Sequence, residues 1–165
     1  MNDEGPSNTK HSGSSFDDSL DEEGIRECVD AVSLRRLVRY LLGNADRIGW
    51  PPDKLSRCQK LVCAAFRTDF VPIDRESKIG IAMATKGLVP LNGLRHPPTV
   101  GTSGWYIWWG EQLSTDDDFF VPLHARHFFD EFLEPAALLG LAPGSRFIWT
   151  MDCLDVWNDP SLLNC

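Results

Sequence analysis

Two histidines, His124 and His127, stand three residues apart in the C-terminal half of the chain. On a helix, residues at i and i+3 share a face, and two imidazoles on one face are compatible with a metal pair. The HxxH pattern has no accompanying Glu or third ligand, which a zinc site requires. We therefore expect no metal here, and an enzyme that uses either histidine ranks third of three functional hypotheses.

Three consecutive aspartates, Asp116, Asp117 and Asp118, offer oxygen ligands of the kind that Ca²⁺ prefers. The spacing of an EF-hand loop is absent. Carboxylates ahead of a helix are also favourable because the N-terminal end of a helix is electropositive. The pattern therefore indicates a solvated turn that precedes a helix.

The cysteines are five in number, an odd count, and none forms a CxxC pair. Such a set argues against a disulfide framework and against a zinc site. We expect all of them to be reduced thiols: Cys28, Cys58, Cys63, Cys153 and Cys165.

Catalytic motifs are missing from the sequence. It has no Gly-rich phosphate loop, no GxSxG elbow and no HExxH pattern. Cys–His catalysis would require Cys153 to meet His124 or His127, and the spacing does not favour that. We predict a protein without catalytic residues and without a cofactor.

Length and composition are those of a soluble globular protein: 165 residues, 42% of them hydrophobic. No apolar run approaches the ~20 residues of a membrane helix, and the N-terminus is polar and acidic rather than a signal peptide. We expect a cytoplasmic protein with a disordered acidic tail over residues 1–23 and a single domain over residues 24–165.

Charge is divided unevenly along the chain, whose net charge is −8. Residues 1–23 carry −6, residues 24–103 carry +6 and residues 104–165 carry −8. The simplest interpretation is that the basic and acidic halves face each other in the fold. The alternative is that the acidic half presents a surface to a basic partner.

Two helices are expected in the basic half. Leu34, Leu37, Val38 and Leu41 have helical spacing, and Pro51-Pro52 opens a second helix, so the two predict a helical hairpin. The arginines of the first helix form a basic stripe without interleaved aromatic residues, next to an acidic tail. This composition does not favour direct nucleic-acid binding.

The stretch from Gly101 to Glu111 contains four aromatic residues within five positions, between glycines. Aromatic and β-branched residues between such breakers predict a strand. In a strand, Trp105, Ile107 and Trp109 point to one face, while Tyr106 and Trp108 point to the other. Both faces are then apolar, and each must be covered by a helix, another sheet or a partner.

The fold class predicted from these patterns is α+β, with helices packed on a mostly antiparallel four-stranded sheet. Residues 78–84 favour a strand, although a helix that ends at Gly87 is a competing interpretation. Residues 87–101 are expected to be a loop, because Asn92-Gly93 favours a turn and Pro97-Pro98 cannot donate to a β ladder. The four expected strands are residues 78–84, 104–109, 145–150 and 154–158.

Five segments together resemble a known family. They are Leu91 to Pro98; Ser-Gly-Trp-Tyr-Ile-Trp-x-Gly-Glu from Ser103; Asp-Phe-Phe-x-Pro-Leu-His from Asp118; Leu-Gly-Leu-x-Pro-Gly-x-Arg-Phe from Leu139; and Asp-Val-Trp-x-Asp-x-Ser-Leu-Leu from Asp155. The set resembles the bacterial immunity-protein-33-like domains of polymorphic toxin systems, over about residues 58–163. The resemblance implies a small α+β protein that binds and neutralises a cognate toxin domain, and it supplies no catalytic residues.

The leading hypothesis is therefore a non-enzymatic immunity protein that occludes the active site of a basic toxin acting on nucleic acid. The runner-up is a regulatory or scaffolding interaction module without a toxin. We predict a partner-binding face in which aromatic residues are combined with carboxylates, as interaction hot spots often are. Its members are Trp108, Glu111, Asp116, Asp117, Asp118, Asp155 and Trp157.

Overall fold

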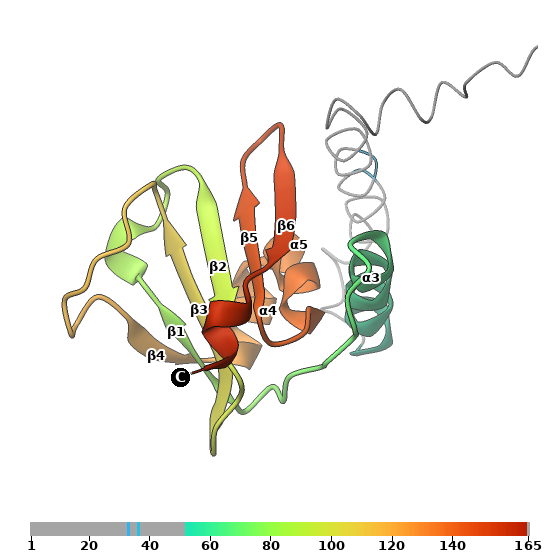
Figure 1. Ribbon diagram of the computed structural model, residues 1–165, viewed down its shortest axis with the longest axis horizontal. Coiled ribbons are helices and arrows are strands. Elements are labelled where there is room, and N and C mark those ends of the chain that lie inside the picture. The colour runs from blue at the N-terminus through green and yellow to red at the C-terminus, as the bar shows by residue number, and fades with distance from the viewer. Residues whose placement is uncertain (1–32, 34–35, 37–51, 165) are drawn as a thin grey trace, which may run out of the picture.

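The computed structural model describes Ser33, Arg36 and residues 52–164, and Figure 1 shows their arrangement. The helix expected near residues 34–41, the helical hairpin and the acidic tail lie outside the described residues. Helix α3 spans Pro52–Ala65, which is the second helix that the proline pair predicts. Its buried residues include Leu55, Cys58 and Val62.

Six strands form one sheet, in the order β4-β1-β3-β2-β5-β6. Strands β1 and β3 are parallel, and every other neighbouring pair is antiparallel. The strands are β1 (Lys78–Ile81), β2 (Leu91–Arg95), β3 (Thr102–Trp109), β4 (Val121–His124), β5 (Ser145–Trp149) and β6 (Leu154–Asn158). The predicted four-stranded sheet is thus wrong: it lacks β2 and β4, and the sheet is mixed.

Strand β2 replaces the loop that was expected over residues 87–101. The two prolines lie beyond its last residue, Arg95, so they interrupt no ladder hydrogen bond. Asn92 does not form a turn; its side-chain Nδ2 donates to the carbonyl of Gly110 at 2.7 Å. Gly93 lies opposite Phe147 of β5, where a Cβ atom would overlap the aromatic ring. Residues that usually mark turns are here fixed by contacts with distant segments.

The segment 78–84 is a strand only as far as Ile81. A short 3₁₀-helix, η1 (Met83–Thr85), follows it. Strand β4 was missed because Pro122 lies within it, and proline is accepted only at particular positions of an edge strand.

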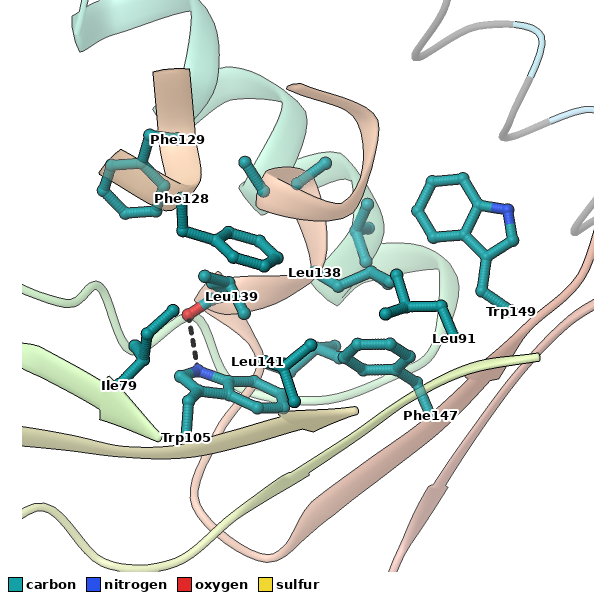
Figure 2. Close-up of a cluster of buried hydrophobic side chains, with 14 of the residues drawn as sticks. Ile79, Leu91, Trp105, Phe128, Phe129, Leu138, Leu139, Leu141, Phe147 and Trp149 are labelled. Atoms are coloured by element: carbon teal, nitrogen blue, oxygen red, sulfur yellow. Dashed lines mark hydrogen bonds between the residues drawn. The ribbon is translucent and has the colours of Figure 1, made fainter. Parts of the chain in front are cut away.

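One face of the sheet, carrying Trp105, Ile107 and Trp109, packs against helices; we call it the helix face. Its cover comes from α3, α4 (Ala125–Glu131), α5 (Leu133–Ala136) and the 3₁₀-helix η2 (Ala137–Gly140). Figure 2 shows Leu138 and Leu139 of η2 and Phe128 of α4 in this core. The indole Nε1 of Trp105 donates to the carbonyl of Leu139 at 3.1 Å, so the largest buried ring also has its polar atom paired.

The opposite face carries Tyr106 and Trp108 and is called the second face. A smaller apolar cluster joins Trp108, Leu94 and Leu162, with Phe119 and Phe120 packed against it. Leu162 belongs to the C-terminal 3₁₀-helix η3 (Pro160–Leu163), which lies in front of the sheet in Figure 1, while α4 and α5 lie behind it. The alternation predicted for the aromatic stretch is confirmed; at β3 the second face is covered at Trp108, while Tyr106 is 37% exposed.

Within residues 52–164, no helix combines the length and the hydropathy that crossing a membrane would require.

Substitution Gly93→Ala tests the contact that defines β2. Phe147 is 1% exposed and cannot turn away, so the added methyl group should lower the free energy of unfolding by about 1–3 kcal/mol. Urea denaturation of the wild type, the two single variants and the double variant Gly93→Ala/Phe147→Leu measures this. The alanine should cost clearly less in the Phe147→Leu background; equal costs in both backgrounds would contradict the contact.

Candidate partner-binding surface

Strand register arranges the second face in two rows that cross the sheet. Trp108 of β3 is opposite Asn92, which is opposite Ile148 of β5, which is opposite Asp155 of β6. The neighbouring row runs from Tyr106 through Leu94 and Arg146 to Trp157. The rows therefore join the centre of the sheet to its β6 edge.

Trp108, one of the two aromatic residues predicted in the binding face, is only 7% exposed. Its ring packs edge to face against Phe120, with the ring centroids 6.3 Å apart. Trp108 thus supports the second face from within the core and offers little surface for contact. Within the described part of the chain, its buried Nε1 has no hydrogen-bond acceptor.

The carboxylates that follow β3 are exposed. Glu111 comes directly after Gly110, and Asp116, Asp117 and Asp118 lie in the connection from β3 to β4. Asp116 is held locally, because its Oδ2 accepts a hydrogen bond from the hydroxyl of Ser114 at 2.7 Å. This acidic loop leads into Phe119 and Phe120, which anchor it over Trp108.

On β6, both predicted residues reach solvent. Asp155 is exposed, and Trp157 is 38% exposed despite its size. Ile148, opposite Asp155 on β5, is 37% exposed. This part of the second face therefore combines apolar area with a carboxylate.

The predicted residues form two groups on one face of the molecule. Trp108 and Asp155 occupy the same row with two strands between them, which at about 4.8 Å per strand is roughly 14 Å. A partner that contacts the acidic loop and β6 together would need to span the row. No partner is present to test the assignment, so the seven residues remain a prediction.

Asp159 holds η3 against this face. Its Oδ1 accepts hydrogen bonds from the backbone N–H of Ser161 at 3.0 Å and from the Ser161 hydroxyl at 2.5 Å. Its Oδ2 lies 2.6 Å from Nε of Arg146. The Ser161 hydroxyl, aided by Arg146, lowers the pKa of Asp159 below its ordinary value. The aspartate thus ties η3, with its buried Leu162, to β5.

The two histidines are near each other. Their ring centroids are 6.4 Å apart, and Nδ1 of His124 lies 2.9 Å from the carbonyl oxygen of Glu76. Among residues 52–164, no three metal-binding side chains cluster.

Arg95 is a buried residue whose role sequence analysis missed. It is 1% exposed, and its guanidinium donates to the carbonyls of Val71 at 2.7 Å, Ser103 at 3.3 Å and Leu141. Burial lowers its pKa to about 10, so it stays charged at neutral pH. A cleft of about 440 Å³ adjoins it, lined also by Asp74 and Glu76. The only advance signal was its position in the motif that begins at Leu91.

The thiols of α3 are structural. Cys58 and Cys63 are buried, and burial raises the pKa of Cys58 above its ordinary value and that of Cys63 to about 11. Cys63 also donates to the carbonyl of Gly140 at 3.3 Å. Both are therefore protonated and unreactive at neutral pH. Cys28 and Cys165 lie outside the described residues.

Substitution Asp159→Asn should weaken the attachment of η3 while keeping an oxygen that can accept from Ser161. Because the pKa of Asp159 is lower in the folded state, its charge stabilises the fold above the ordinary pKa of about 3.9, and this contribution is lost as the pH falls through the lowered value. The urea midpoint of the wild type should exceed that of the variant above about pH 5, and the gap should close in acid. The control Asp118→Asn, at an exposed loop position, should leave the urea midpoint unchanged both above about pH 5 and in acid. A pH-independent gap for Asp159→Asn would contradict the role of its charge.

Comparison with known proteins gives one result. The model of the Imm33-like domain family matches residues 58–159, a region that begins within α3 and ends at Asp159. Searches of curated proteins and of solved structures return no match. The matched region contains all six strands and most of the helix face. The resemblance seen in the sequence motifs is thereby confirmed, and the chain belongs to the Imm33-like domain family.

Proposed function

We propose that this protein is an immunity protein that binds a cognate bacterial toxin domain and neutralises it by occluding the toxin's active site. It acts by binding rather than by catalysis, in the cytoplasm of the cell that produces the toxin. The observation that carries the proposal is the family match over residues 58–159. An immunity family implies a toxin as the partner.

The charge of the second half supports the choice of partner. Residues 104–165 carry a net charge of −8, and the carboxylates Glu111, Asp116, Asp117, Asp118 and Asp155 are all exposed. Many intracellular toxins act on nucleic acid and are basic, because a positive surface favours the approach to phosphates. An acidic inhibitor surface would speed and orient association with such a toxin.

The surface also has the composition of an interaction site. Trp157 and Ile148 expose apolar area next to Asp155, and tryptophan is enriched among residues that dominate binding energy. Trp108 contributes indirectly, because its buried ring supports the loop that carries the acidic run.

Co-expression with the toxic domain encoded beside this gene tests the function. We expect the full-length protein to restore growth and to co-purify with the toxin domain in a stoichiometric complex. A protein that neither restores growth nor binds any neighbouring gene product would refute the immunity function.

Charge reversal of the acidic loop tests the electrostatic part. The triple variant Asp116→Lys, Asp117→Lys, Asp118→Lys should slow association with the toxin domain about tenfold at low salt, and the difference should shrink as ionic strength rises. Stopped-flow or surface plasmon resonance measures the rate. A control variant with lysines at Asp17, Asp18 and Asp21 changes the net charge equally. Equal rates for the two variants would remove the acidic loop from the binding surface and leave the immunity function standing.

A further inference from the structure

The two edges of the sheet differ in a way that bears on binding. The edges are β4 and β6. Next to the β1–β4 pair, the backbone N–H of Ala125 donates to the carbonyl of Ser77 at 2.9 Å. This bond determines which opposite residues of β1 and β4 are hydrogen-bonded to each other. By alternation, Ile79 and Leu123 exchange ladder hydrogen bonds, and Pro122 stands at a position whose backbone nitrogen faces outward. Proline at this position removes a donor from the outer edge, which blunts it.

The same alternation identifies the outward groups of β6. The bonds Asp159 N to Gly144 O, at 2.7 Å, and Thr150 N to Cys153 O, at 2.8 Å, flank the β5–β6 pair. The pairs in register between them, Arg146 with Trp157 and Ile148 with Asp155, are therefore the hydrogen-bonded ones.

The remaining β6 residues, Leu154, Val156 and Asn158, direct their N–H and C=O groups away from β5. Within the part of the chain that the structure describes, these groups have no hydrogen-bond partner.

Strand β6 lacks the features that protect an edge. Its sequence, Leu-Asp-Val-Trp-Asn, contains no proline and no lysine, and its register with β5 is continuous, without a bulge. Leu154 is only 4% exposed, so the accessible outward groups are those of Val156 and Asn158. Open backbone groups of this kind are the template for β-augmentation, in which an extended segment of a partner adds a strand.

The side chains of β6 specify what such a strand would carry. A residue placed beside Asp155 would extend the row of Trp108, Asn92 and Ile148, and lysine or arginine there would pair with the carboxylate. Two positions along the strand, a residue beside Trp157 would contact the half-exposed indole, which favours an apolar side chain. The residue of the added strand between these two would lie beside Val156, whose side chain packs against the helix-face cluster, so it would also be apolar.

We propose that the toxin partner docks by adding an extended segment to the outer edge of β6, with a basic residue beside Asp155 and an apolar residue beside Trp157. This proposal rests on the proposed immunity function and names the mode of binding. Charge argues for a basic partner and against a second copy of this chain, because pairing two copies would bring together two C-terminal halves that each carry −8.

The test reproduces on β6 what Pro122 does on β4. Val156→Pro removes one outward N–H and places a ring at the edge, while the hydrogen-bonded pairs of Asp155 and Trp157 with β5 are retained. Its matched control, Val156→Ala, loses the same packing but keeps the N–H. Binding of the full-length variants to the adjacent-encoded toxin domain, made inactive by mutation, is measured by calorimetry. We expect Val156→Pro to bind at least about tenfold more weakly than Val156→Ala, which should bind nearly as the wild type does.

A second measurement needs no variant. Amide hydrogen exchange by NMR should show that Val156 and Asn158 exchange rapidly in the free protein and slowly in the complex. The amides of Asp155 and Trp157, already bonded to β5, should change little. This result would support the edge even if Val156→Pro failed to fold.

Several outcomes would overturn the proposal. If Val156→Pro binds as tightly as Val156→Ala, or if the amides of Val156 and Asn158 stay fast in the complex, the toxin binds elsewhere, while rescue by the wild type keeps the immunity function. If these amides are already slow in the free monomer, the edge is occupied by the rest of the chain. If sedimentation shows a dimer that Val156→Pro dissociates, the occupant is a second copy. If the wild type neither rescues nor binds, the immunity function itself fails.

Discussion

The structure depends on burying the tryptophans that strand β3 directs to both faces of the sheet. The alternating aromatic residues of β3 place Trp105 on one face and Trp108 on the other, and both rings are buried. Burying a large aromatic side chain is among the largest favourable contributions to the free energy of folding. The helix face is closed by η2, whose Leu139 carbonyl also pairs the Trp105 indole. The second face is closed by Phe120 and by Leu162 of η3. The segments on either side of β3 therefore fold back over it, and β3 becomes a central strand.

This two-sided cover is uneven, and the unevenness produces the candidate surface. Phe119 and Phe120 cover the second face near β3, and η3 covers the region of Leu94. Tyr106 of β3 remains 37% exposed, and toward β6 the cover ends, so that Ile148 and Trp157 are each more than one-third exposed. The acidic loop is fixed at the covered end and Asp155 at the open end. The same face thus offers carboxylates at both ends, with apolar area concentrated at the edge.

Sequence patterns predicted the elements whose signals are local. The period-two pattern around Trp105 predicted β3, and the strands expected at residues 145–150 and 154–158 are β5 and β6. Strand β2 was missed because its Asn92-Gly93 pair has a turn-forming composition. Each of the two residues is instead required by a contact with a segment distant in sequence: the carbonyl of Gly110 accepts a hydrogen bond from the Asn92 side chain, and the ring of Phe147 leaves no room for a Cβ atom at Gly93. For the candidate surface, the carboxylates and Trp157 that sequence analysis selected are exposed, but Trp108, which it also selected, is buried. Burial of that ring depends on Phe120 reaching it across a loop, which no spacing rule encodes.

A protein that leaves one sheet edge unprotected must limit what can join it. Pro122 blunts the β4 edge by removing a donor, which is protection without selectivity. The β6 edge has Asp155 in place of such a block, and a carboxylate repels acidic segments while it attracts basic ones. In a chain whose C-terminal half carries −8, this choice also discourages pairing between copies. The difference between a proline at one edge and an aspartate at the other is therefore the difference between discouraging every strand and selecting among them.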